Sequence, residues 1–426
     1  MSIRYILQLV GVFFYVMGGF PLLWAQEKEK VKLEYSFKPG DEIFYTGEIR
    51  IDITGDNLPS GGFDFSAPLT FGIKVLKVNP DGSALAYYRI RTMLEKLNLH
   101  RGKKADLEKI YEILYTSGFL PEEFVVARLT KDGNSYYAGK TYSGRTLAML
   151  PPEPLAPGEE IHRTEYSSGA LISTTWELKS VKVKGGNRIA FFNLLREIGK
   201  KNYGPPSAVG GRLSFDIEFD MDSSTLLSLS GISVVSREAL GHKSSTKNTI
   251  RQVAKIRYKK VDLQDVDSYT RWGEIPDVFL NPGERWTVGY AESRRMNDIL
   301  IEYVPRGAEV YSWRDMLTVR ITSKFSQGVI KPEDVLKYTF IAVKKKCPGV
   351  GYNILERNSN SVIYECFFPR KCMGEKFDFS EHDIGRIIVG KERIHVIIYA
   401  TKDIPVSPER RLKIVDFLKH IKLSNE

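Results

Sequence analysis

The chain has 426 residues, more than one hydrophobic core usually serves, so its length favours two or three domains. Hydrophobic residues make up 42% of it, which excludes a chain too polar to build packed cores. Its 62 basic and 52 acidic residues give a formal charge of +10, with both signs interspersed along the chain. Such a balance could favour anionic surfaces such as lipid headgroups or acidic glycans, but it mainly keeps a protein soluble. We expect no nucleic-acid partner.

Residues 1–25 have the pattern of an export signal. Arg4 precedes an apolar run from Tyr5 to Ala25, and the polar stretch QEKEKVK follows. This order predicts a signal peptide that is cleaved after Ala25. The alternative is a retained anchor, because Leu23 is a poor residue two positions before the cleavage point and the run is long enough to span a bilayer. In both cases we expect an exported body in the periplasm or cell envelope of a bacterium, with membrane association only if residues 5–25 are retained.

Strand-like stretches dominate residues 31–262. Apolar and polar residues alternate in several segments, as in half-buried strands: VKLEYSF, TFGIKVLKV, ALAYYRIR, TTWELKSVKV, RLSFDIEFD and IRQVAKIRYKKV. One amphipathic helix is predicted within them, KADLEKIYEILYTSGF at 104–119. This pattern predicts a large antiparallel half-barrel or sandwich, which could divide into two lobes at 31–150 and 151–262.

A Pro-Gly turn recurs three times before a strand-like run. The three stretches are KPGDEIFY at 38–45, APGEEIHR at 156–163 and NPGERWTV at 281–288. Proline pre-sets the first central torsion of a type II turn, and glycine accepts the positive φ of the second. The turns therefore predict three strand starts, and their spacing suggests three modules.

The pattern changes after residue 262. Charged residues, proline and glycine without periodicity predict a linker at 263–282. Residues 283–426 are expected to form an α+β domain with a disulfide. Its predicted elements are a strand in DILIEYVPRG, a helix that begins in SWRDMLTVRI, a helix in KPEDVLKYTFIAVKKKC, a hairpin, a strand in RIHVIIYAT and a last helix capped by Ser407.

All three cysteines lie between residues 347 and 372, and three interpretations compete for them. Their spacing is C-x18-C-x5-C, whereas zinc sites usually contain close pairs such as C-x2-C. A Cys3His site with His382 or His395 stays open, and so does a catalytic thiol with either histidine as its base. Neither histidine lies in a recognisable nucleophile motif, and we therefore favour a structural disulfide.

A predicted hairpin indicates which cysteines pair. If Ser359 and Asn360 are its two turn residues, Cys347 faces Cys372 across the strands, and Cys366 faces Asn353. Cys366 is then expected to be a buried small hydrophobic residue. A disulfide also agrees with export.

The C-terminal pattern resembles an uncharacterised domain of exported bacterial proteins. The resemblance rests on Cys347-Pro348, Tyr364-Glu365, Cys372, the stretches IGRIIVGK and IIYATK, and the closing helix. Residues 30–262 are similar to uncharacterised β-rich envelope proteins that open with a Pro-Gly-Asp turn. These resemblances imply a Cys347–Cys372 disulfide and an envelope setting, and they imply no activity. Cys366 stands where the resemblance would place an aromatic residue.

Two groups of charged residues are candidate sites. Glu365, Glu381, His382, Asp383 and Arg386 form the best acid–base group, and we expect them to be an ionic network that fixes the hairpin to its sheet. Lys255, Arg257 and Lys259 alternate along one predicted strand and therefore share a face. That stripe is expected to be a solvated face, with binding to an anionic surface as the alternative.

No motif in the sequence identifies a reaction, and no cofactor or metal ion is expected. We predict a non-catalytic envelope or periplasmic protein that binds a lipid, a glycan or a protein partner, since an open half-barrel offers a concave surface. The alternatives are a hydrolase that uses Glu381, His382 and Asp383, and an inert assembly component.

Overall fold

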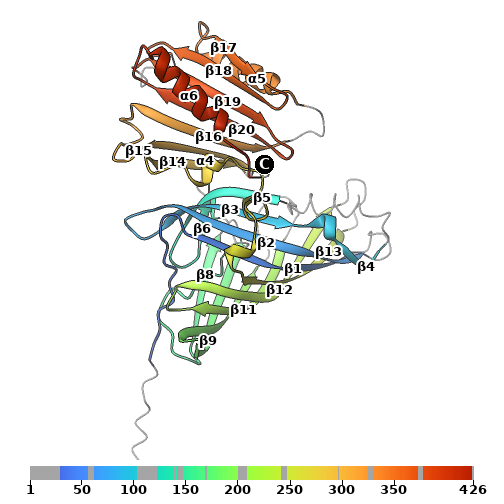
Figure 1. Ribbon diagram of the computed structural model, residues 1–426. Helices are drawn as coiled ribbons and strands as arrows, with labels where there is room; N and C mark the ends of the chain where they lie inside the picture. Colours follow the sequence, from blue (N-terminus) through green and yellow to red (C-terminus); the bar gives the residue numbers. More distant parts are fainter. Residues whose placement is uncertain are drawn as a thin grey trace, which may run out of the picture.

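The computed structural model describes eleven stretches of the chain, at residues 29–55, 62–102, 122–137, 140–141, 147–167, 170–199, 209–240, 247–295, 297–324, 330–372 and 378–424. In this part of the chain, two large antiparallel sheets lie against each other (Figure 1). The fold is therefore strand-rich, with a large antiparallel region followed by an α+β region, as predicted. The predicted signal peptide at 1–25 and the predicted helix at 104–119 lie outside the described residues.

The first sheet contains the first thirteen strands of the described chain. Along the sheet their order is β7-β6-β5-β3-β2-β1-β13-β12-β11-β10-β9-β8, with β4 paired to β2. The strands are β1 (Glu42–Gly55), β2 (Phe63–Val78), β3 (Ala84–Thr92), β4 (Asn98–Arg101), β5 (Glu122–Leu129), β6 (Ser135–Tyr137), β7 (Lys140–Thr141), β8 (Glu160–Ser167), β9 (Ala170–Lys184), β10 (Asn187–Ile198), β11 (Val209–Asp220), β12 (Thr225–Leu240) and β13 (Lys247–Lys260). Strand β1 pairs with both β2 and β13, so residues before and after 150 form one continuous sheet. The sheet is not closed, because its end strands β7 and β8 do not pair with each other.

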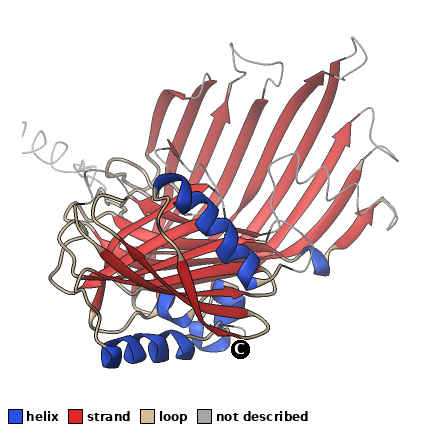
Figure 2. Cartoon of the chain, turned by 90° about the horizontal axis from the view of Figure 1, so that it is seen from above, coloured by secondary structure: helices blue, strands red, loops and turns tan. Residues whose placement is uncertain are grey.

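The first sheet bends around its own core (Figures 1 and 2). We call the face that carries this core the inner face. Side chains of β2, β3 and β5 meet those of β9, β10 and β11 there, and residues 31–37 and 147–155 pack between them. Tyr35 donates a hydrogen bond to the carbonyl of Ala148 at 3.1 Å, and Trp176 donates one to Met149 at 2.9 Å. The inner face is thus a filled hydrophobic core at this end of the sheet.

Each Pro-Gly turn leads into a strand, as predicted. Gly40, Gly158 and Gly283 have φ values of 88°, 90° and 88°, in the region that favours glycine. They precede β1, β8 and β14 respectively. The first two strands belong to the same sheet, so the three turns do not mark three separate modules.

The second sheet has seven strands in the described residues, in the order β14-β15-β16-β20-β19-β18-β17. They are β14 (Trp286–Arg295), β15 (Asp298–Pro305), β16 (Asp315–Ser323), β17 (Tyr352–Arg357), β18 (Ser361–Phe368), β19 (Glu381–Val389) and β20 (Arg393–Thr401). Helix α5 (Pro332–Lys346) packs on one face, and helix α6 (Pro408–His420) packs on the other. Ser407 caps α6 as predicted, since its side chain accepts a hydrogen bond from the backbone N–H of Arg410.

The predicted helix in SWRDMLTVRI is wrong, because this stretch leads into strand β16. Leu317, Val319 and Ile321 are fully buried and alternate with more exposed residues. That period of two belongs to a strand with one face on a core. β16 lies in the interior of the sheet, between β15 and β20, where its backbone is paired on both sides.

The segment at 263–282, predicted as a linker, runs between the two sheets and is packed against both. It contains the one-turn elements η4 (Leu263–Asp265), α3 (Ser268–Trp272) and α4 (Asp277–Leu280). Trp272, Glu274, Ile275 and Phe279 have no solvent exposure. Their apolar members join a core that includes Tyr87 and Phe124 of the first sheet and α6 of the second. We call residues 263–282 the connector.

A buried ionic cluster also joins the two sheets. Glu122 of β5 accepts hydrogen bonds from Arg89 of β3 and from Arg393 of β20, both at 2.5 Å. In the connector, Glu274 accepts the backbone N–H of Lys391 at 2.8 Å and lies 3.3 Å from Nε2 of His395. Without such partners, burial of each of these charges would raise the free energy of the folded state.

The connector is completed by residues far along the chain. The backbone N–H of Asp277 donates to Lys422, and that of Ser424 donates to Ile275, both at 2.9 Å. The hydroxyl of Ser424 also donates to the carbonyl of Gly273. Residues 422–424 therefore cover the connector where it enters α4.

Candidate functional site

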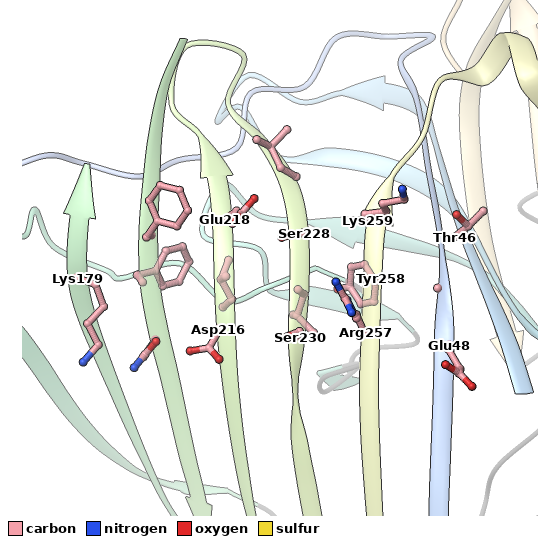
Figure 3. A pocket seen from close by; sticks show the side chains of 17 residues that line it. Thr46, Glu48, Lys179, Asp216, Glu218, Ser228, Ser230, Arg257, Tyr258 and Lys259 are labelled. Atoms are coloured by element: carbon pink, nitrogen blue, oxygen red, sulfur yellow. The ribbon is translucent and has the colours of Figure 1, made fainter. Parts of the chain in front are cut away.

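A hollow lies on the first sheet, on the face opposite its core (Figure 3). It has a volume of about 990 Å3 and is lined by residues of β1 and of β9 to β13. We call it the outer-face groove. Because side chains alternate across a strand, the residues between those of the core face outward into it.

Two parallel rows of side chains cross the strands in this groove. Strand register places one row as Phe191, Glu218, Ser228, Lys259 and Thr46, from β10 to β1. It places the other as Asn193, Asp216, Ser230, Arg257 and Glu48. Neighbouring strands are about 4.8 Å apart, so each row is roughly 19 Å long.

Two β-bulges shape one end of the groove. The register of β9 with β10 shifts at Phe191/Phe192, and that of β11 with β12 shifts at Glu218/Phe219. Each shift leaves one extra residue, Lys179 in β9 and Leu227 in β12, and both of these line the groove. A bulge bends its strand and increases the local twist, which accounts for a hollow on a face that would otherwise be convex.

The predicted basic stripe lies on this outer face. Lys255, Arg257 and Lys259 are all exposed, and the last two line the groove. Among the described residues, neither Arg257 nor Lys259 forms an ion pair, although Glu48 stands opposite Arg257 in the register. Lys255 faces Arg50 and Ile232 instead. The groove thus holds two cationic side chains whose charge is not neutralised by a direct partner.

The groove offers hydrogen-bond donors and acceptors in close alternation. Asp216 and Glu218 supply carboxylates, Ser228 and Ser230 supply hydroxyls, and Asn193 supplies an amide. Phe191 adds an apolar ring that Lys184 approaches to 4.7 Å from its centroid. Such a surface suits a polar, hydroxyl-rich ligand that carries negative groups.

The predicted acid–base group is not one network, because strand alternation divides it between two faces of the second sheet. Glu365, His382 and Arg386 lie on the face that α6 covers, and Glu381 and Asp383 lie on the other. His382 and Asp383 are consecutive in β19, so their side chains point in opposite directions. The hydrolase alternative required these side chains to act together, and this geometry separates them.

On the α6 face, the charged residues attach the helix to the sheet. Glu365 accepts two hydrogen bonds from Arg411 of α6, at 2.7 and 2.9 Å, and lies 3.6 Å from Nε2 of His382. Arg386 donates to the carbonyls of Leu418, Lys419 and Ile421 at the end of α6. These are helix-end carbonyls without partners inside the helix, so Arg386 caps α6 with a positive charge.

On the opposite face, Glu381 and Asp383 line a separate pocket of about 440 Å3, which we call the carboxyl pocket. Burial raises the pKa of both groups, and the two carboxyls are hydrogen-bonded to each other. The remaining walls are largely apolar and come from β14, β15, β16, β18 and nearby loops: Tyr290, Glu302, Val310, Tyr311, Trp313, Met316, Phe368, Pro369, Cys372 and Phe379.

The cysteines form the predicted disulfide between Cys347 and Cys372, with Cα atoms 5.2 Å apart. Its setting differs from the cross-strand pair that we expected. Cys347 follows the last turn of α5, and Cys372 lies in the turn after β18. The bridge therefore ties a helix end to a loop.

A bulge explains the different register. Ser359 and Asn360 do form the hairpin turn, and Arg357 pairs with Val362 as predicted. The register then shifts between Ile354 and Glu356, so that Cys366 faces Tyr352 rather than Asn353.

The structure excludes the other interpretations of the cysteines. Two of the three sulfurs are bonded to each other and cannot act as thiolate ligands. Cys366 is a buried free thiol whose pKa is raised by burial and by the neighbouring carboxyl of Asp383. His382 points to the opposite face, and His395 is fully buried beside Glu274.

The sequence contained a signal for the groove but not for the ionic cluster. The polar positions of RLSFDIEFD alternate with apolar ones, and they place Ser214, Asp216 and Glu218 on one face. Their alignment with β12 and β13 depends on bulges that no local pattern predicts. Arg89, Glu122, Glu274 and Arg393 come from four distant segments, and only the tertiary fold brings them together.

No family model and no curated protein matches the chain. Solved structures that align with it include OccK9 (OpdG) of Pseudomonas aeruginosa, with 7% identity over 85% of this chain and 98% of that one, at a TM-score of 0.14. OpdQ and OccK2 (OpdF, in complex with glucuronate) of the same organism each show 7% identity and a TM-score of 0.12, over 84% and 86% of this chain and 96% and 100% of theirs. TM-scores this low assign neither a shared fold nor a function. Within the described residues, no helix combines the length and the apolar character needed to cross a membrane.

Proposed function

We propose that this protein is an exported component of a bacterial cell envelope that binds an acidic glycan in the outer-face groove without transforming it. The observation that carries this proposal is the pair of polar rows, in which Arg257 and Lys259 stand among carboxylates, hydroxyls and an amide. The envelope setting is supported by the Cys347–Cys372 disulfide and by the signal-like residues 1–25.

The chemistry of the groove favours a glycan over a lipid tail. Sugar hydroxyls donate and accept hydrogen bonds, and the groove presents partners of both kinds: acceptors on β11, donors on β13, and hydroxyls on β12 that can do either. The carboxylates of an acidic sugar would pair with Arg257 and Lys259, which have no ionic partner among the described residues. An acyl chain would need an apolar cavity, whereas the inner face of the sheet is already filled by its own core.

The test is calorimetric titration of the chain from Gln26 onward with two oligosaccharides of equal length, an oligogalacturonate and a neutral maltooligosaccharide. We expect the acidic glycan to bind and the neutral one to bind far more weakly. Arg257→Ala and Lys259→Ala should each weaken binding by about tenfold, since each removes one charge-assisted hydrogen bond.

Lys344→Ala is the matched control, because Lys344 is an exposed residue of α5 and its loss lowers the net charge equally. Its affinity should equal that of the unmodified protein. An equal loss for all three variants would show general charge attraction and contradict the groove as the site. Absence of binding by either glycan, with stable capture of an envelope protein, would favour the assembly component instead.

A further inference from the structure

The carboxyl pocket contains chemistry that the glycan proposal does not use. We propose that it binds an organic ammonium ion, meaning a protonated amine carried on an apolar body small enough for a pocket of about 440 Å3. The proposal rests on one buried carboxyl oxygen without a hydrogen-bond partner, on aromatic walls and on an ammonium group that the protein itself places against those walls.

Asp383 is the first of these features. Its side chain is only 7% exposed, and it lines the pocket together with Glu381. Its Oδ1 atom has no hydrogen-bond partner in the described part of the chain. A buried carboxylate oxygen without a partner loses its hydrogen bonds to water and forms none with the protein. A bound cation would therefore stabilise it.

The charge of the lining points to a cation. Every charged residue that lines the pocket is acidic, namely Glu302, Glu381 and Asp383. Burial raises the pKa of Glu381 and Asp383, and the neighbouring carboxyl of Glu381 raises that of Asp383 further. An ammonium ion that enters the pocket would supply a positive charge beside them.

The aromatic walls favour an organic cation over a metal ion. Trp313 and Phe379 line the pocket and meet edge to face, with ring centroids 5.8 Å apart. Aromatic faces attract an ammonium group through their quadrupole and pack against its apolar body. A hard metal ion would instead need several oxygen ligands, and no cluster of three or more metal-ligating side chains occurs among the described residues.

Lys402 shows that these rings hold an ammonium group. Its Nζ atom lies 3.9 Å from the ring centroid of Trp313 and 3.7 Å from that of Phe379. Burial lowers the pKa of Lys402, and the carboxyl of Glu381 acts in the opposite direction. The side chain thus competes with any ligand for the same rings and the same negative charge.

The experiment is calorimetric titration with benzylamine, with benzyl alcohol as the neutral probe of the same shape. We expect benzylamine to bind and benzyl alcohol not to bind. Asp383→Asn should weaken benzylamine binding by about tenfold, because it removes a charged hydrogen-bond acceptor. Lys402→Met should strengthen it severalfold, because it removes the competing ammonium group.

Asp416→Asn is the matched control, since Asp416 is an exposed carboxylate of α6 on the other face of the sheet. It should leave benzylamine binding unchanged. Far-ultraviolet circular dichroism establishes that each variant is folded before it is titrated. Equal binding of the amine and the alcohol would overturn the proposal, and so would weaker binding after Lys402→Met in a folded protein.

Discussion

At the scale of single residues, the joint between the two sheets depends on a carboxylate shared by two guanidinium groups. Burial by itself would raise the pKa of Glu122, but Arg393 and Arg89 outweigh burial and lower it to about 2. Both arginines are only 1% exposed, so each needs this counter-charge. Loss of one carboxylate would leave two buried cations with less charge compensation.

Glu122 should therefore make stability depend on pH. Because its pKa is lower in the folded state than in the unfolded chain, its contribution is fully present above pH 4.5 and is lost as pH falls towards 2. A shift of this size corresponds to about 3 kcal/mol. We expect Glu122→Gln to lower the free energy of unfolding by about that amount at neutral pH and to flatten its acid dependence. Urea unfolding at a series of pH values measures both effects.

Glu95→Gln is the control for this change, since Glu95 forms an exposed ion pair with Arg91. It should alter stability only slightly at any pH. An acid dependence that persists unchanged in Glu122→Gln would assign the pH effect to other carboxyls.

At the scale of elements, the disulfide fastens α5 to the loop that follows β18. Leu336 and Phe340 of α5 pack on Val362, Tyr364 and Cys366 of β18, and the bridge closes the end of this helix-to-sheet contact. The two cysteines are separated by 25 positions, so the crosslink restricts the unfolded chain over the β17–β18 hairpin.

Replacement of both cysteines, Cys347→Ser with Cys372→Ser, should therefore lower the free energy of unfolding by about 3 kcal/mol in the chain-entropy model. The measurement is urea unfolding with and without dithiothreitol. The reductant should destabilise the unmodified protein and leave the double variant unchanged. Cys366→Ala keeps the bridge and should retain the sensitivity to reductant; a variant that loses it would point to a different cysteine pairing.

The same elements show what could be predicted from the sequence. α5 and α6 have apolar stripes and clear start signals, so local pattern was sufficient for both. β16 was mistaken for the start of a helix, because its register in the sheet interior decides its conformation. The disulfide partners were correct although their setting was not, since β17 begins after Cys347 and β18 ends before Cys372.

The sequence predicted only part of each candidate site, because strand register and tertiary contacts complete the rest. Alternation placed Arg257 and Lys259 on one face, but five other strands and two bulges complete the groove around them. Alternation also places His382 and Asp383 on opposite faces of the sheet, because they are consecutive residues of β19. Trp313 and Phe379 meet Glu381 only through the folded sheet.

At the scale of the whole molecule, the connector behaves as part of the interface between the sheets. Gly273 has a φ of 73°, and a Cβ atom there would lie 2.4 Å from Nη2 of Arg393 and 2.9 Å from Nε of Arg89. A side chain at this position would therefore push apart the arginines that Glu122 holds together.

Gly273→Ala should loosen the two sheets from each other while each keeps its own core. We expect faster proteolytic cleavage within 263–282 and a lower midpoint of thermal unfolding. Gly283→Ala is the matched control, because Gly283 has a φ of 88° and nothing within 4 Å of an added Cβ. The difference between the variants isolates the contact with the arginines from backbone strain. Equal cleavage in both would show that the contact does not hold the sheets together.

The connector is completed by residues near the end of the chain, and this sets an order of events during synthesis, which proceeds from the N-terminal side. The backbone N–H of Ile275 donates a hydrogen bond to the hydroxyl of Ser424, which is 149 positions later. The thirteen strands of the first sheet can pair as soon as they have been synthesised. The contacts between the connector and residues 422–424 can form only after the last residues of the chain have been synthesised. Until then the outer surfaces of β3 and β5, which carry Tyr87 and Phe124, stay uncovered. The nascent chain would therefore expose apolar surface during this interval that the finished protein buries.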